Sequence, residues 1–224
     1  MLYVVATPIG NLKDITYRAI EILKNSDIIA CEDTRRSRKL LNAYDISKPL
    51  ISCYARKEDF AAQQICALLE DGKTVAYISD AGTPGLSDPG TVLVQKVKEN
   101  GFPVNVVPGP SAFAALCSVS GFPGKSVTFE GFLSPKAGRR RKRLGELVER
   151  KEAFVIFESP ARIIKLLNDL ADICPNRKIL LGREMTKIYE EYIEATAKQM
   201  LEILLKRELI KGEMTILVSS EKKH

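Results

Sequence analysis

The sequence predicts an α/β fold made of two α/β domains, on three observations. Short runs rich in β-branched residues alternate with segments of helical periodicity through the first half. The strand-like runs are almost continuously apolar, as is typical of parallel strands covered on both faces. Two glycines and a proline within residues 121–125 then interrupt the pattern, and a second set of strands and helices follows. We therefore expect one domain over residues 1–120 and another over residues 121–224.

The first domain is expected to hold a largely parallel sheet with helices between its strands. Its predicted strands are Leu2–Ala6, Asp27–Cys31, Leu50–Cys53, Thr74–Ser79 and Pro103–Val107. Ile15–Lys24 and Phe60–Leu69 repeat apolar residues with the 3.6-residue period of helices packed on a sheet. A third helix, Val92–Lys98, is expected to have Asp88 as its N-cap and Pro89 as its first residue, and to end at Gly101.

The second domain is expected to hold a mixed sheet. Its predicted strands are Ser126–Leu133, Ala153–Glu158, Lys178–Arg183, Ile188–Ala195 and Glu213–Ser219, with helices near Arg141–Arg150, Ala161–Ile173 and Ala197–Arg207. Two of these strands, Lys178–Arg183 and Ile188–Ala195, follow each other without an intervening helix. Such neighbours pair antiparallel, so this sheet cannot be wholly parallel.

Composition excludes several classes of chemistry. The single histidine is His224, the last residue, which argues against Ser-His-Asp, Cys-His and histidine-metal sites. The five cysteines are odd in number and none is two residues from another, so we expect buried thiols and no metal site. No apolar run reaches about 18 residues and the first residues lack the features of a signal peptide, which predicts a cytoplasmic protein without membrane contact.

Glycine and proline gather after three predicted strands, at residues 7–11, 80–90 and 108–112. All three loops follow the carboxyl ends of strands, and this edge of an open α/β sheet is where ligands bind. None of the loops matches a dinucleotide fingerprint or a P-loop. Ser111 lies where a helix begins after Pro110, and the free backbone amides of a helix N-terminus suit a carboxylate. Asp80 supplies the opposite charge and can accept hydrogen bonds from an amino group or from ribose hydroxyls.

A series of motifs spans residues 3 to 219. In order, they are Tyr3–Leu12, Glu32-Asp33-Thr34-Arg35, Ser79–Gly90, Val107–Ala112, Glu130–Leu133, Glu158-Ser159-Pro160 and Arg183–Lys187. Together they resemble the ribosomal RNA small subunit methyltransferase I family of the tetrapyrrole methylase class, although Ala161 stands where that family leads us to expect histidine. The resemblance implies a homodimeric enzyme that binds S-adenosylmethionine in a cleft between its two domains and methylates a cytidine 2′-oxygen in 16S ribosomal RNA of the small subunit.

The same resemblance carries the family's cofactor contacts onto positions of this sequence. These are Pro8, Ile9, Gly10, Asp80, Ala81, Gly82, Thr83, Ser111, Ala112, Phe157, Glu158 and Met214. A ribose hydroxyl also needs a base or a polarising cation within hydrogen-bond reach. With histidine excluded, the open candidates are Glu32, Asp33, Glu158, Glu184 and Lys187, and for each of them a structural ion pair is at least as strong an alternative.

Two basic runs favour an RNA substrate, since each cation can displace counterions from a phosphate backbone. One run contains Arg35, Arg36, Arg38 and Lys39; the other contains Lys136, Arg139, Arg140, Arg141, Lys142 and Arg143. Two other functions stay open: a methyltransferase of this fold that acts on a tetrapyrrole or another small molecule, and a non-catalytic RNA-binding factor for ribosome assembly. The basic runs argue against the first, and the three glycine-rich loops argue against the second.

Overall fold

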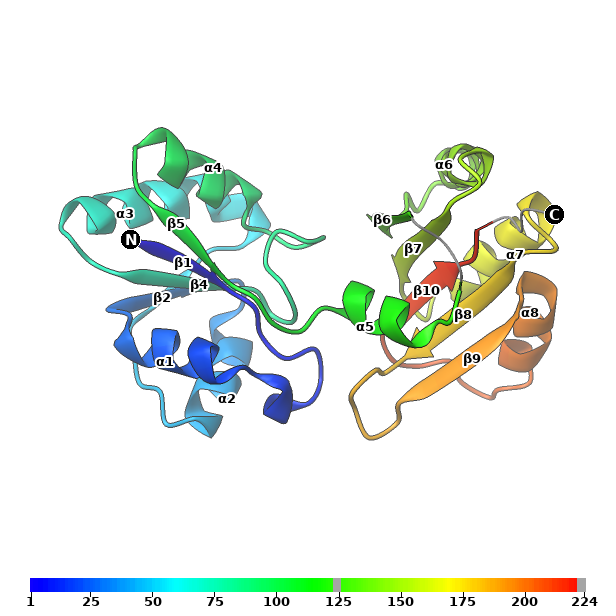
Figure 1. The fold of residues 1–224 in the computed structure, drawn as a ribbon, viewed down its shortest axis with the longest axis horizontal. Coiled ribbons are helices and arrows are strands. Elements are labelled where there is room, and N and C mark those ends of the chain that lie inside the picture. Colours follow the sequence, from blue (N-terminus) through cyan, green and yellow to red (C-terminus); the bar gives the residue numbers. More distant parts are fainter. Residues whose placement is uncertain (123–125, 221–224) are drawn as a thin grey trace. The chain divides into compact units, whose positions relative to one another are not determined.

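The computed structural model describes residues 1–122 and 126–220 and divides into two compact units, Met1–Ser111 and Ala112–His224. Each unit is an α/β structure built on its own five-stranded sheet, which confirms the predicted fold class (Figure 1). Among the described residues, no helix is long and apolar enough to cross a membrane. The glycine-rich connector expected at residues 121–125 lies partly outside the described residues.

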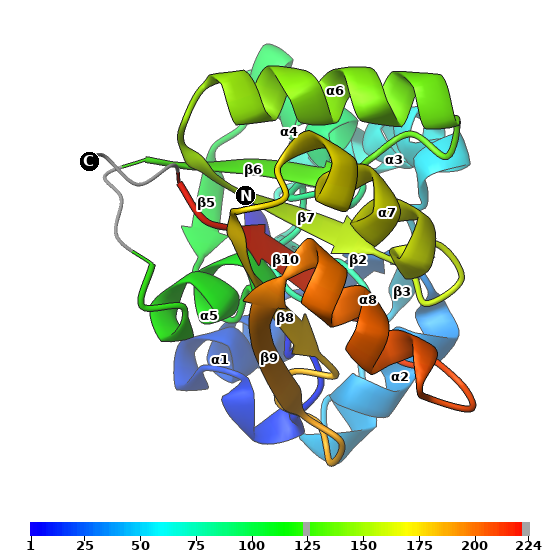
Figure 2. The same ribbon diagram turned by 90° about the vertical axis from the view of Figure 1, so that its right-hand side faces the viewer.

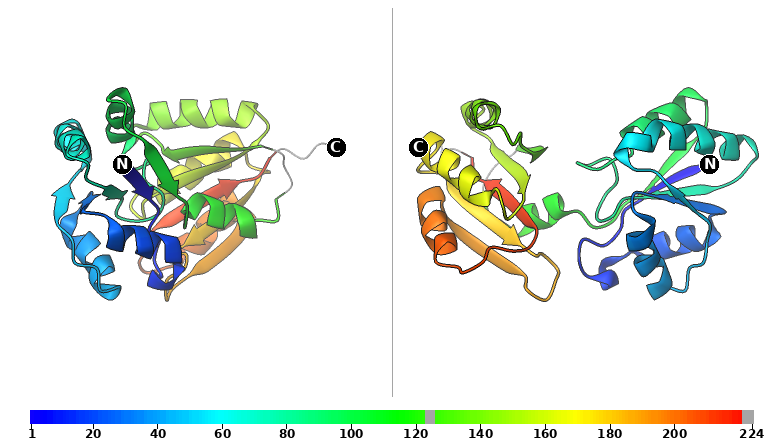
Figure 3. Two further views of the ribbon diagram at one scale, coloured as in Figure 1. Left: turned by 60° about the vertical axis from the view of Figure 1, so that its left-hand side comes forward. Right: turned by 180° about the vertical axis from the view of Figure 1, so that it is seen from behind.

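The first unit contains a wholly parallel sheet of order β3-β2-β4-β1-β5. Its strands are β1 (Leu2–Val5), β2 (Ile28–Cys31), β3 (Leu50–Ser52), β4 (Val75–Ile78) and β5 (Val104–Val107), all five as predicted. Helices α1 (Tyr17–Asn25) and α2 (Thr34–Ala43) cover one face, whereas α3 (Glu58–Glu70) and α4 (Thr91–Glu99) cover the other (Figures 1 and 3). Each face buries a separate apolar cluster, which explains why these strands are apolar on both sides.

Two local predictions for this unit were wrong or incomplete. Helix α4 begins at Thr91 with Gly90 at the N-cap, so Asp88 is not the N-cap and Pro89 is not the first helical residue. A distant side chain caps this helix instead: Oε1 of Glu58 accepts hydrogen bonds from the backbone N–H groups of Gly90 at 2.8 Å and Leu93 at 3.0 Å. Helix α2, which carries the first basic run, was not among the expected helices.

The second unit contains a mixed sheet of order β6-β7-β10-β8-β9, as predicted. Its strands are β6 (Val127–Phe132), β7 (Ala153–Glu158), β8 (Lys178–Arg183), β9 (Glu191–Thr196) and β10 (Met214–Val218). Only β6 and β7 pair parallel; the other neighbours run antiparallel. Helices α6 (Ala137–Glu149), α7 (Ile163–Ile173) and α8 (Ala197–Leu205) pack on one face around an apolar core (Figure 2).

Helix α5 (Ala112–Val119) packs on the other face of this second sheet. A side chain at Gly182 of β8 would collide with Leu116 of α5, because a Cβ there would lie 2.8 Å from Cδ1 of Leu116. The structure therefore groups α5 with the second unit and divides the chain after Ser111, whereas the sequence interpretation placed this helix before the division at residue 120.

Candidate active site

The three glycine-rich loops follow β1, β4 and β5, which are three adjacent strands of the first sheet, with β5 at its edge. Because these strands are parallel, the loops leave the sheet at the same edge, as predicted. They are also bonded to one another: Thr7 and Gly82 exchange two backbone hydrogen bonds of 2.9 and 3.0 Å, and Oγ1 of Thr83 donates to the Pro110 carbonyl at 3.2 Å. The loops thus form one connected backbone surface.

Glycine is required at two positions of this surface. Gly82 has a φ of +78°, a left-handed conformation that side chains disfavour. A Cβ on Gly109 would lie 3.1 Å from the Cβ of Ala6. The remaining expected contacts of this unit accompany them: Pro8 is buried, Ile9 and Ser111 are half-buried, and Gly10 and Ala81 are exposed. This edge can therefore hold a ligand mainly by its backbone groups.

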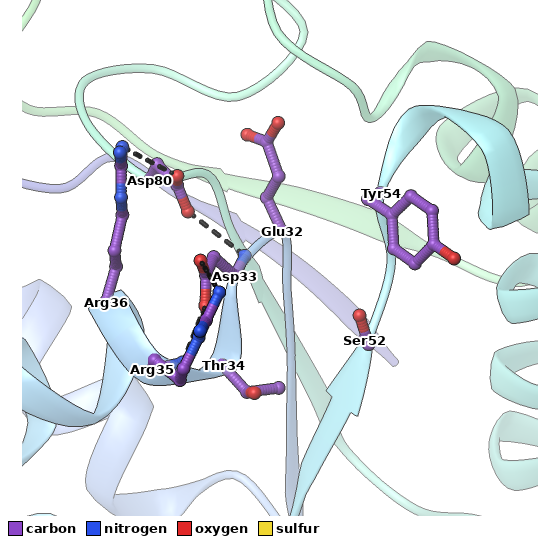
Figure 4. Close-up of a pocket in the computed structure, with 8 residues that line it drawn as sticks. All are labelled: Glu32, Asp33, Thr34, Arg35, Arg36, Ser52, Tyr54 and Asp80. Atoms are coloured by element: carbon purple, nitrogen blue, oxygen red, sulfur yellow. Dashed lines mark hydrogen bonds and ion pairs between the residues drawn. The ribbon is translucent and has the colours of Figure 1, made fainter.

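A pocket of about 460 Å³ opens beside these loops, where β2 and β3 end (Figure 4). It is lined by Glu32, Asp33, Thr34, Arg35, Arg36, Ser52, Tyr54 and Asp80. Strand pairing explains the assembly, because Cys31 of β2 is in register with Ser52 of β3 and with Ile78 of β4. Residues at the ends of the three strands, or shortly after them, therefore meet around one opening.

Asp80 has two structural partners in the first unit. One carboxylate oxygen accepts the backbone N–H of Asp33 at 3.0 Å, and the other pairs with Arg36 at 3.0 Å (Figure 4). The side chain thus ties the end of β4 to the start of α2, and its expected contact with a ligand stays a prediction. Asp33 is the N-cap of α2, since its Oδ1 accepts the N–H of Arg35 at 2.8 Å.

The two acidic candidates in the pocket differ in basicity. The hydrogen bond from the Arg35 backbone, together with its guanidinium, lowers the pKa of Asp33 below its usual value. Burial, reinforced by the carboxylates of Asp80 and Asp88, raises the pKa of Glu32. A carboxylate whose pKa is raised is the better proton acceptor, so Glu32 is the stronger candidate for a base.

The second-unit candidates gather at one end of the second sheet. Met214 of β10 pairs directly with Glu158 of β7, and the Phe157 ring lies 5.0 Å from the ring of Phe129. Glu158 is 2% exposed, and its carboxylate pairs with Arg162 at 3.0 Å and accepts the N–H of Ser159 at 2.8 Å. Phe157, Glu158 and Met214 are thus neighbours. Oε2 of the buried Glu158 has no hydrogen-bond partner among the described residues beyond its ion pair with Arg162.

Glu184 and Lys187 form a structural ion pair with their Nζ and Oε1 atoms 3.0 Å apart. The same Glu184 oxygen accepts the backbone N–H of Glu213 at 2.8 Å, and this hydrogen bond is the main reason why the pKa of Glu184 is lowered. Glu184 thus fastens the β8–β9 connection to the residue before β10. These contacts favour the structural alternative that the sequence left open for both residues.

The second basic run splits into internal and exposed cations. Arg140 is 4% exposed and its Nε lies 2.6 Å from Asp169, so it does not present the free cation that the sequence predicted for RNA binding. Arg141 bridges Asp169 and Asp172, and Arg143 pairs with Glu130 and Glu146. These pairs stabilise α6 against its neighbours. Lys136, Arg139 and Lys142 are exposed, and so is Arg141 despite its ion pairs.

The first basic run is exposed throughout, at Arg35, Arg36, Arg38 and Lys39 on α2. Sequence reasoning missed a second group on the other side of the pocket: Ser52 and Tyr54, followed by the exposed Arg56 and Lys57. The Lys57 ammonium lies 5.9 Å from the centroid of the Tyr54 ring. An aromatic residue followed by two cations at a strand end was the signal that could have revealed this group.

The fold and the loop edge define a class of protein. The model of the tetrapyrrole (corrin/porphyrin) methylases matches residues 1–201, and the chain belongs to this family. Solved structures agree on the fold: a cobalt precorrin-4 methyltransferase superposes with a TM-score of 0.71 at 17% identity, covering 97% of this chain and 94% of its own. Uroporphyrin-III C-methyltransferase from Thermus thermophilus gives a TM-score of 0.67 at 18% identity, with 97% and 93% covered.

Within this class, the chain belongs with the ribosomal RNA small subunit methyltransferase I proteins. The protein of that name from Borrelia garinii subsp. bavariensis is 49% identical over 98% of both chains. Its counterpart from Thermotoga maritima is 43% identical, also over 98% of both chains. This level of identity spans both units and confirms the family that the sequence motifs indicated.

Proposed function

We propose that this protein transfers a methyl group from S-adenosylmethionine to the 2′-oxygen of a cytidine ribose in 16S ribosomal RNA. The observation that carries the proposal is the identity of 43–49%, over nearly the whole chain, with proteins named ribosomal RNA small subunit methyltransferase I. The natural substrate is 16S ribosomal RNA within the small subunit, and the working enzyme is a cytoplasmic homodimer.

The residues of the loop edge fit S-adenosylmethionine. The close approach of Gly109 to Ala6 and the left-handed backbone of Gly82 let the loops pack together at this edge. Glycine-rich loops at the carboxyl ends of strands suit a polar ligand held through its own amino, carboxylate and hydroxyl groups. When bound, this cofactor supplies an activated methyl group on a sulfonium. The proposed first-unit contacts are Pro8, Ile9, Gly10, Asp80, Ala81, Gly82, Thr83, Ser111 and Ala112. The proposed second-unit contacts are Phe157, Glu158 and Met214.

Glu32 is the proposed general base. A ribose hydroxyl is a weak nucleophile until its proton leaves, and the raised pKa of Glu32 makes its carboxylate a better acceptor for that proton than Asp33. Asp33 and Asp80 hold the start of α2 in place through their hydrogen bonds, which fixes the backbone next to the base. They act as positioning residues.

The exposed cations provide the proposed contacts to the RNA backbone. On α2 these are Arg35, Arg38 and Lys39; on α6 they are Lys136, Arg139 and Lys142. Changing the three α6 cations to alanine is expected to reduce the slope of log affinity against log salt by about 2 to 3, since each phosphate contact contributes about 0.7 to 0.9. The ion-paired Arg141 and Arg143 are excluded from this set.

The decisive experiment is transfer of labelled methyl to small subunits that lack the modification, followed by digestion of the RNA with alkali. A 2′-O-methyl group blocks attack of the 2′-oxygen on the adjoining phosphate, so the label is expected in an alkali-resistant dinucleotide that contains cytidine. Label in mononucleotides would mean base methylation and would overturn the proposal. Labelling of a tetrapyrrole with no labelling of RNA would assign the protein to a small-molecule branch of the same fold.

A further inference from the structure

The pocket at the ends of β2 and β3 combines three kinds of group around one opening. A carboxylate, Glu32, stands between the cationic start of α2 on one side and the aromatic ring of Tyr54 on the other (Figure 4). The hydroxyl of Ser52 also lines the pocket. Its volume of about 460 Å³ falls in the range of small-molecule sites, about 300–1,000 Å³.

Tyr54 supplies the aromatic side chain of the pocket. It is half-buried and directly precedes the short 3-10 turn of residues Ala55–Lys57, which lies between β3 and α3. Lys57 approaches the ring with its ammonium 5.9 Å from the centroid, a cation–π distance. The ring therefore carries a partly exposed π surface, next to a cation, at the mouth of a polar pocket.

The opposite side of the pocket supplies charge for a phosphate. The side chain of Arg35 is 88% exposed, and its guanidinium lies 3.5 Å from Asp33, so it can turn to an anion at little cost. Arg36, in contrast, is held at 3.0 Å by Asp80. An exposed cation, a carboxylate and an aromatic ring match the three parts of a nucleotide: its phosphate, its ribose hydroxyl and its base.

We propose that this pocket receives the acceptor nucleotide, unstacked from its neighbours in the RNA, with the base stacked on Tyr54, the adjoining phosphate at Arg35 and the ribose towards Glu32. The inference rests on the proposed function and deepens it, because it names the substrate subsite. Proteins that recognise unpaired nucleotides of folded RNA commonly hold the base splayed out and stacked on an aromatic side chain, which compensates for the lost stacking. Stacking on one ring accepts any base, so Tyr54 contributes affinity and alignment while leaving sequence choice to other contacts.

The first test compares Tyr54→Leu with Tyr54→Phe and with Tyr17→Leu. Tyr17 lies on α1 and is 94% exposed, so its variant controls for loss of a surface tyrosine. With modification-free small subunits and saturating cofactor, Tyr54→Leu is expected to lower kcat/KM about 5- to 150-fold, the range for loss of one base–aromatic stack. Tyr54→Phe keeps the ring and should lose at least fivefold less, whereas Tyr17→Leu should match wild type. Equal losses in the two Tyr54 variants, or no loss in either, would refute stacking.

A second test uses the wild-type protein and therefore does not depend on whether a variant folds. Small subunits reconstituted with 16S RNA that contains 5-iodocytidine are irradiated with the wild-type protein, and the crosslinked peptide is identified by mass spectrometry. A crosslink at Tyr54 supports the pocket, and crosslinks confined to other peptides overturn it. The two proposals can fail separately. Methyl transfer to the cytidine 2′-oxygen, with no effect of the Tyr54 substitutions and no crosslink at Tyr54, would reject only the pocket. A crosslink at Tyr54 without methyl transfer to RNA would reject only the reaction.

Discussion

Arg140 is expected to stabilise the fold, whereas its neighbour Arg139 is expected to bind RNA. The side chains of Arg140 and Asp169 are 5% and 9% exposed, and their charged atoms lie 2.6 Å apart between α6 and α7. Arg139 belongs to the same basic run but is exposed. Alanine at each position thus removes one cation from the same helix in two different environments.

The magnitude follows from what is left behind. Removing one partner of a buried ion pair costs about 3–5 kcal/mol, because the other charge stays buried without compensation. Arg141 still contacts Asp169 at 2.8 Å, so we expect about 3 kcal/mol for Arg140→Ala. For a chain of this length, that free energy lowers the melting temperature by about 6–12 °C. Arg139→Ala should change the free energy of unfolding by less than about 0.5 kcal/mol, as is usual at exposed sites.

Differential scanning calorimetry and RNA-binding titrations on both variants check this reasoning. Arg139→Ala should weaken RNA binding and its salt dependence without a change in melting temperature. Arg140→Ala should lower the melting temperature and, at temperatures where the variant is folded, leave RNA binding unchanged. An Arg140→Met/Asp169→Leu double variant should recover most of the lost stability, because apolar residues of similar size can replace a buried pair. Melting temperatures within 2 °C for Arg139→Ala and Arg140→Ala would refute the assignment of Arg140 to the fold.

Three further predictions follow. Glu32→Gln should reduce methyl transfer about 10²- to 10⁴-fold with cofactor affinity unchanged, and wild-type kcat/KM should fall as pH drops through the raised pKa of Glu32, since only the ionised form accepts a proton; full activity in Glu32→Gln would reject it as the base. Glu58→Ala should lower stability by about 2–3 kcal/mol in urea melts, because two buried N–H groups at the start of α4 lose a charged acceptor; a loss below 0.5 kcal/mol would contradict this. Arg207 and Arg183 lower the pKa of Glu191 to about 2, so their ion pairs stabilise the protein above the ordinary glutamate pKa and are lost as pH falls towards 2. Between pH 6 and 2, wild type should therefore lose about 1–2 kcal/mol more than Glu191→Gln after allowance for solvent screening, and parallel stability profiles would disprove the coupling.

The sequence predicted the sheets well because their determinants are local. Apolar runs with β-branched residues mark β1 to β5, and parallel order brings the three glycine-rich loops to one edge without further information. The start of α4 was mispredicted because its cap, Glu58, lies 32 residues before Gly90 in the chain. A local motif such as Asp88-Pro89 could not reveal a capping group that only tertiary structure brings into place.

The basic runs show a different limit. Helix α2 was missed because its buried face consists of little more than Ser37 and Leu41, so the apolar period was too weak to read. In α6, the period carried more information than the sequence interpretation used. Arg140, Leu144 and Leu147 recur at helical spacing and are the buried residues of that helix, which places Arg140 on its apolar face. The acid that neutralises it, on α7, could not be identified from the sequence alone.

The acceptor of this protein must be selected by side chains and not by the fold. Methyltransferases of small molecules share the architecture at TM-scores of 0.67–0.71 with only 17–18% identity, so the same sheets serve different acceptors. Here, the element that sets charge near the loop edge is α2, and its N-cap Asp33 directly follows Glu32. The cap fixes the first turn, so the cations at Arg35 and Arg38 keep a constant helical spacing from the proposed base. A flexible loop with the same composition would carry equal charge but would not align a phosphate with a proton acceptor. The fixed spacing between the cap and the cations is therefore a stronger argument for a polyanionic acceptor than the net charge is.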